Sequence, residues 1–88
     1  QQIRLQLENA KNNYTLAIAN YETAKQNLTL SERIENKNQI KYKEGLATSF
    51  ELRQAQTQLY TTQQEFLQSM VEVINKKTEL EIILNTKA

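Results

Sequence analysis

One glycine, Gly45, is the only strong chain breaker in an 88-residue sequence that has no proline, and it lies near the middle. Glycine and proline are the residues that most readily end or bend a helix. Two uninterrupted segments of about 40 residues therefore flank a single site where the chain can reverse direction. As helices, these segments would each be about 60 Å long, because each residue adds about 1.5 Å.

The segment before Gly45 carries a heptad repeat, with steps that alternate between 4 and 3 residues. It runs through Ile3, Leu7, Ala10, Tyr14, Ala17, Tyr21, Ala24 and Leu28. This spacing places the side chains on one seam of a coiled-coil helix. Farther on, the same register reads Ser31, Glu35, Asn38 and Tyr42, while the apolar residues move to Leu30, Ile34 and Ile40. We expect the seam to weaken there.

The segment after Gly45 has the same alternation of 3 and 4. Its seam positions are Leu52, Ala55, Leu59, Thr62, Phe66, Ser69, Val73, Lys76, Leu80 and Ile83. A second line of apolar residues lies beside this seam, at Tyr60, Leu67, Met70, Ile74 and Leu84. The wider apolar face predicts contacts with neighbours on two sides. Lys76 is expected to extend its ammonium group to water from its seam position.

The residues around Gly45 combine the signals that end one helix and begin another. Lys41 and Lys43 put positive charge at the C-terminal end of the first helix, and Gly45 supplies a residue that tolerates positive φ. Thr48 and Glu51 have the spacing of a capping box. In that motif the Thr48 side chain accepts a hydrogen bond from the Glu51 amide, and the Glu51 carboxylate accepts one from the Thr48 amide.

The sequence therefore predicts an all-α fold, an antiparallel two-helix coiled-coil hairpin that forms a single domain over residues 1–88. We expect helices at about 2–43 and 49–86, and a turn at about 44–48. Two arms alone bury only one narrow seam, so a lone hairpin would be marginally stable. Self-association into a four-helix bundle, or insertion into a larger barrel, is expected.

Composition excludes several function classes. The chain has neither Cys nor His, so disulfides, thiol chemistry and imidazole catalysis are excluded within it, and no zinc site of the usual kind is expected. Its net charge is +1, which gives no electrostatic footprint for nucleic acid or an anionic membrane. No apolar run approaches the ~20 residues of a membrane span. We expect no enzyme activity, no cofactor, no metal and no membrane insertion by this segment.

The stretch from Tyr42 to Leu59 has the pattern Y-x-x-G-[LT]-x-[ST]-x-x-[DE]-[LV]-x-x-A-[QR]-x-x-L. Ala10 to Ala24 upstream form A-x3-Y-x2-A-x3-Y-x2-A heptads, and the second segment ends in "KKTELEIILN". Across its whole length the chain resembles the TolC family of outer-membrane efflux proteins. In that family two hairpins from each of three protomers build a periplasmic tunnel below a β-barrel. The resemblance implies that this chain is one such hairpin, a fragment of a longer protein.

The resemblance also implies site residues at the tip of the hairpin. The tip would dock onto hairpins of a periplasmic adaptor (membrane fusion) protein through Tyr42, Gly45, Leu46, Ala47, Thr48 and Ser49. Glu51 matches a position that forms an acidic pore constriction in some members of the family. Tyr42 matches a tyrosine that, in some members, makes a hydrogen bond between helices and so holds the pore closed. Capping is an alternative role for Glu51, and packing is one for Tyr42. Ala47 and Gln54 stand where some members carry an arginine and a second acidic ring, so neither feature is expected here.

The resemblance implies that this segment is the periplasmic part of an outer-membrane protein of a Gram-negative bacterium. Such a protein would export drugs, and so give multidrug resistance, or export other substrates. The resemblance implies a trimer for the full-length protein, and we expect a dimer for the fragment. Two alternative interpretations of the chain are a generic structural coiled-coil hairpin and an adaptor hairpin. Either would mediate other protein–protein contacts. The R-x3-L-x6-S signature of adaptors is missing, because Arg4, Arg33 and Arg53 are followed four residues later by Glu8, Lys37 and Thr57.

Overall fold

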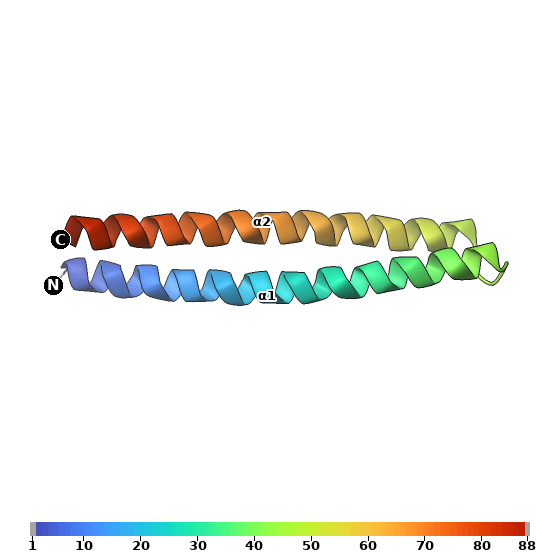
Figure 1. The fold of residues 1–88 in the computed structure, drawn as a ribbon, viewed down its shortest axis with the longest axis horizontal. Coiled ribbons are helices and arrows are strands. Elements are labelled where there is room, and N and C mark those ends of the chain that lie inside the picture. Colours follow the sequence, from blue (N-terminus) through green and yellow to red (C-terminus); the bar gives the residue numbers. More distant parts are fainter. Residues whose placement is uncertain (1, 88) are drawn as a thin grey trace.

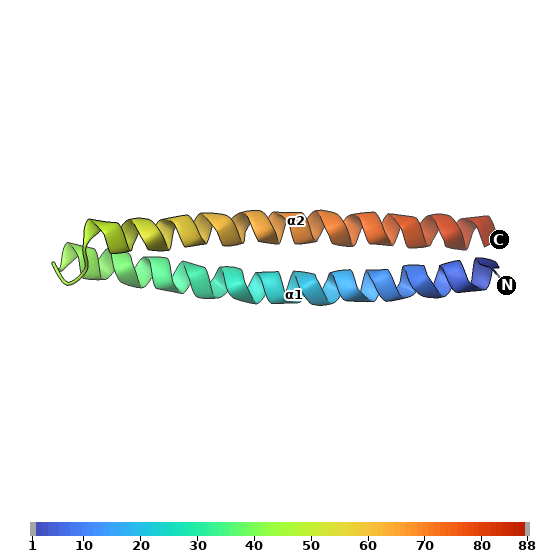
Figure 2. The ribbon, with the colours of Figure 1, turned by 180° about the vertical axis from the view of Figure 1, so that it is seen from behind.

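A computed structural model describes residues 2–87, which form two long helices, α1 (Gln2–Lys43) and α2 (Ser49–Lys87). The helices run antiparallel, side by side along their whole length, and the start of α1 and the end of α2 lie at the end opposite the turn (Figures 1 and 2). The Cα extents are 65 × 14 × 13 Å. The radius of gyration is 19.4 Å, against about 12 Å for a compact domain of this length. The predicted all-α hairpin is confirmed; positions 1 and 88 of the predicted domain lie outside the described residues.

A Schellman motif ends α1 and reverses the chain. The Leu46 amide donates to the Lys41 carbonyl at 2.8 Å, and the Gly45 amide donates to the Tyr42 carbonyl at 3.1 Å. These two bonds satisfy carbonyls that would otherwise lack partners at the helix end. The motif requires a left-handed residue, and Gly45 has a φ of 76°. The turn thus forms where the sequence predicts it, for the predicted reason.

Small residues bring the two helices together along the seam. The buried side chains are Leu7, Ala10, Ala17, Ser31, Ala55 and Thr62. Counting both seams outward from Asn38 and Leu52 places Phe66 opposite Ala24, so that a large side chain meets a small one. The rings of Tyr21 and Phe66 contact each other with centroids 5.3 Å apart. This alternation of sizes explains how two slender helices pack closely.

Near the turn the seam keeps its register and becomes polar. Ser31 is buried, and Glu35 and Asn38 are half-buried. Gln39 Nε2 donates to Glu35 Oε1 at 2.6 Å, and Asn38 Nδ2 donates to the carbonyl of Ile34 at 2.8 Å. The apolar residues of this region remain exposed: Leu30, Ile34 and Ile40. A continuous helix cannot rotate toward them without breaking its own hydrogen bonds, so the register of the earlier heptads persists.

Hydroxyl groups on the seam of α2 are satisfied within their own helix. The Thr62 hydroxyl donates to the carbonyl of Leu59 at 2.9 Å, and the Ser69 hydroxyl donates to the carbonyl of Phe66 at 2.7 Å. No buried side-chain nitrogen or oxygen in the described part of the chain lacks a hydrogen-bond partner. Neither helix, over residues 2–87, is apolar enough along its length to cross a bilayer.

Candidate functional site at the hairpin tip

The tip, defined here as residues 42–51, brings the predicted site residues together at one end of the molecule. Tyr42 lies in the last turn of α1, Ser49 and Glu51 lie in the first turn of α2, and Gly45 lies in the turn between the helices. Ala47 is half-buried, and the other residues of the tip are exposed. A partner that approaches the end of the rod would therefore meet nearly all of these residues at once.

Gly45 is required by its backbone conformation and not by crowding. A Cβ atom built at Gly45 would have no heavy atom within 4 Å. Its positive φ is nevertheless a conformation that L side chains rarely adopt. The surface beside Gly45 is consequently open, and a larger residue there would alter the turn before it touched the rest of the hairpin.

Leu46 is the most exposed large apolar residue in the tip, with 72% of its surface accessible. In many Schellman motifs the residue at this position packs back onto the helix that ends there. Here that contact is largely missing, and Ile40, one turn earlier, is itself half exposed at 51%. The tip therefore presents an uncovered leucine at the extreme end of the molecule.

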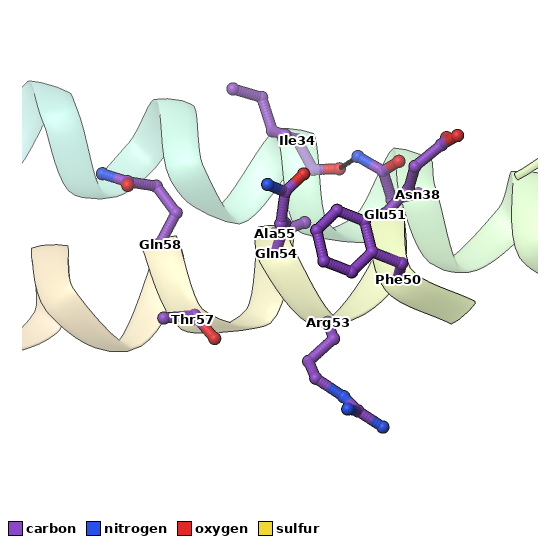
Figure 3. A pocket seen from close by; sticks show the side chains of 9 residues that line it. All are labelled: Ile34, Asn38, Phe50, Glu51, Arg53, Gln54, Ala55, Thr57 and Gln58. Carbon is purple, nitrogen blue, oxygen red and sulfur yellow. Dashed lines mark hydrogen bonds between the residues drawn. The ribbon is translucent and has the colours of Figure 1, made fainter. Parts of the chain in front are cut away.

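Phe50 adds a second exposed apolar side chain, which sequence reasoning did not single out. It lies outside the seam, immediately after the predicted helix start, and that position is the signal that could have identified it. A shallow groove of about 680 Å³ between the helices is lined by Ile34, Asn38, Phe50, Glu51, Arg53, Gln54, Ala55, Thr57 and Gln58. In Figure 3, Phe50 lies over this groove and Arg53 points away from it.

Thr48 caps α2, but the expected capping box forms only in part. The Glu51 amide donates to the Thr48 hydroxyl at 3.1 Å, as predicted. The reciprocal bond, from the Thr48 amide to the Glu51 carboxylate, is absent from the described residues. The expectation of a tied-down carboxylate was therefore wrong. The Glu51 side chain is exposed, so water solvates its carboxylate more favourably when the side chain is extended than when it bends back to the Thr48 amide. Glu51 is one of the residues that line the groove.

Tyr42 occupies a seam position and yet is 45% exposed. Its hydroxyl makes no hydrogen bond to another side chain within residues 2–87. The predicted bond between helices is therefore not made inside this one hairpin, and packing against α2 is loose. A role for Tyr42 in contacts with a neighbouring chain stays a prediction.

The ion pairs of the described residues lie far from the tip, at Lys76 on the seam of α2. Lys76 Nζ lies 3.2 Å from Glu79 Oε2 and 3.6 Å from Glu72 Oε1. The hydrogen bond and charge of Glu79, helped by Glu72, raise the pKa of Lys76 above its usual value. The Lys76 side chain thus extends toward water as expected, and its ammonium group ends beside two glutamates of its own helix.

The chemistry that this tip offers is that of a contact surface. Leu46 and Phe50 supply apolar area, and the turn supplies backbone groups. No group of three or more acidic side chains within residues 2–87 is arranged to hold a metal ion. Comparison of the chain with protein-family models, with curated proteins and with solved structures found no match.

Proposed function

We propose that this chain is a periplasmic tunnel segment of an outer-membrane efflux or secretion channel of the TolC type, and that its tip docks onto an adaptor hairpin. The observation that carries the proposal is the exposed leucine at the end of a rod with Cα extents of 65 × 14 × 13 Å. Leu46 follows directly on the glycine of the Y-x-x-G-L motif, so the motif residues and the uncovered surface coincide.

Two features of the rod support a place in a larger tube over a free-standing hairpin. The apolar line that runs beside the seam of α2 is exposed, which suits neighbours on a second side. The groove beside Phe50 also opens between the helices close to the tip, where an apolar side chain of a docked hairpin could insert. A coiled-coil hairpin that stays monomeric and binds nothing at its tip would need neither feature.

Site-specific photo-crosslinking tests the docking. Because the chain has no cysteine, Leu46→Cys can be labelled at a single site with a benzophenone and mixed with purified adaptor hairpins. We expect crosslinks from Leu46→Cys, because the label then lies in the exposed turn at the end of the rod, where the proposal places the adaptor.

The matched control is Leu16→Cys, a leucine of similar exposure (61%) near the opposite end of the rod. It should give no crosslink above background. Equal crosslinking from both sites, or none from Leu46→Cys with several different adaptors, would contradict docking through the tip and would leave the generic hairpin as the better interpretation.

A further inference from the structure

A side stripe of large apolar residues runs along α2 next to the seam, and the rest of residues 2–87 leaves much of its surface uncovered. Its members and their exposed fractions are Tyr60 (63%), Leu67 (52%), Met70 (37%), Ile74 (60%) and Leu84 (44%). All five lie on the same side of the seam, because each falls one residue after a seam position. The side stripe therefore follows one side of α2, with Gln63 between Tyr60 and Leu67, and with Lys77 and Glu81 between Ile74 and Leu84.

The exposed area of the hairpin matches what a stable interface covers. Its accessible surface is 6889 Å² for a mass of 10.3 kDa. A compact monomer of this mass exposes about 5,300 Å². The excess is about 1,500 Å² for one chain, and obligate homodimers bury about 2,000–5,000 Å² in total, or about 1,000–2,500 Å² per partner. One second copy of similar length is therefore enough to cover it.

The residues of the side stripe are arranged symmetrically about Leu67. Seven residues to either side lie Tyr60 and Ile74, which are both apolar, and seven residues farther lie Arg53 and Glu81, which are oppositely charged. A two-fold interface requires that if one position meets another, the reverse contact is made as well. Antiparallel pairing about Leu67 meets this requirement, because apolar residues meet apolar ones and Arg53 of each copy meets Glu81 of the other.

The opposite orientation is disfavoured by the same residues. Parallel pairing of two stripes in register would set Arg53 against Arg53 and Glu81 against Glu81. Like charges that face each other in this way repel. α1 offers a second pair of opposite charges. Counting outward from the turn, Glu22 and Lys25 lie beside the part of α2 that carries Leu67. In the antiparallel arrangement, Glu22 of one copy faces Lys25 of the other.

We propose that a second copy of this chain covers the side stripe, with the two α2 helices antiparallel and a two-fold axis close to Leu67. The product is a four-helix bundle in which the tips point in opposite directions. This inference does not rest on the proposed docking of the tip. In a tunnel the neighbouring hairpins would point the same way, so the two arrangements use the stripe with different partners.

Mass measurement by light scattering tests whether the stripe holds the dimer. We expect the unmodified chain at about 100 μM to have twice the mass of 10.3 kDa, because this concentration lies above the micromolar to picomolar dissociation constants of standard-size interfaces. Leu67→Asp should give the monomer mass with the helix content unchanged in circular dichroism. Its control, Leu16→Asp, alters an exposed leucine of α1 outside the stripe and should remain a dimer.

Oxidative crosslinking tests the orientation, again with the absence of native cysteine as an advantage. Leu67→Cys alone should form a disulfide-linked dimer, because the two-fold axis brings the two copies of this position together. Tyr60→Cys alone and Ile74→Cys alone should not, because each lies about 10 Å along the helix from the axis, and its two copies are therefore about 20 Å apart. A mixture of these two variants should crosslink.

A monomer mass for the unmodified chain, an unaffected dimer in Leu67→Asp, or efficient self-crosslinking of Tyr60→Cys would each overturn the proposal. Crosslinking at the tip tests whether the dimer and the adaptor docking are independent of each other. Leu67→Asp leaves Leu46 unchanged, so adaptor crosslinking through the tip should survive in that variant if docking is real. Loss of the dimer and loss of docking can therefore be told apart.

Discussion

At the scale of single residues, a backbone conformation decides the fold. Gly45 adopts a φ of 76° in an uncrowded site, so its contribution to the hairpin comes from the turn alone. Thr48 then stops the second helix from fraying, by accepting a hydrogen bond from the Glu51 amide at 3.1 Å. These two positions set where α1 ends and α2 begins.

Replacing Gly45 tests the conformational argument. Gly45→Ala should lower the free energy of unfolding by about 1–2 kcal/mol, because a Cβ atom disfavours the left-handed region. Gly45→Asn should cost less, since asparagine tolerates this region better. Urea unfolding followed by circular dichroism, at one fixed protein concentration, measures both. An equal loss in the two variants would show that something other than φ makes glycine necessary.

At the scale of the helices, polar residues inside the seam limit how tightly α1 and α2 pack. Lys76 is the clearest case, because its side chain is 27% exposed and its charge lies between Glu72 and Glu79. A lysine at a seam position specifies register at a cost in stability. Its ion pairs with neighbours on the same helix offset only part of this cost, since ion pairs exposed to water contribute little to stability.

Replacement of Lys76 by leucine should therefore stabilise the hairpin. Leucine adds apolar burial at the seam, and this gain outweighs the loss of the exposed ion pairs, so the free energy of unfolding should rise. Thermal unfolding measures the change. Lys37→Leu, at an exposed position of α1, is the control and should change stability little. A less stable Lys76→Leu variant would mean that the ion pairs dominate.

Alkaline pH should affect the unmodified chain more than Lys76→Leu. The pKa of Lys76 is raised above 10.5 in the folded hairpin, so its contribution to stability is fully present below the unfolded pKa. It is lost as the pH rises through the folded pKa. The difference in unfolding midpoint between Lys76→Leu and the unmodified chain should consequently widen above pH 10.5. A constant difference would contradict the assignment of this shift to Lys76.

Periodicity predicted the seam of α2 completely and the seam of α1 from Leu7 to Leu28, because a heptad repeat leaves a helix little choice of face. Ile3, the first predicted seam residue, is 50% exposed. The region from Ser31 to Asn38 was harder to predict. There the apolar residues point away from the seam, and only the continuity of the helix keeps polar residues inside. The free carboxylate of Glu51 also could not be predicted, because solvation and local rotamers decide it and neither leaves a pattern in the sequence. The exposure of Phe50, in contrast, could have been predicted from its position outside the seam.

At the scale of the whole molecule, the hairpin is a thin rod that buries little. The six buried residues of its described part include three alanines, and the large apolar residues of the side stripe remain exposed. Such a molecule gains stability from partners more than from its own core. The tip and the side stripe are separate surfaces, one at the end of the rod and one along it, so each can serve a different partner.

The distance between the two ends of the chain tests the hairpin most directly. Spin labels at Asn9→Cys and Glu81→Cys, exposed positions at the open end of α1 and α2, can be measured by pulsed electron paramagnetic resonance. Dilution with unlabelled chain removes distances between copies. Two packed helices have axes about 10 Å apart, so we expect a labelled distance of about 15–25 Å. An unbroken rod would separate the labels by about 108 Å, and a broad distribution beyond about 50 Å would equally contradict a closed hairpin.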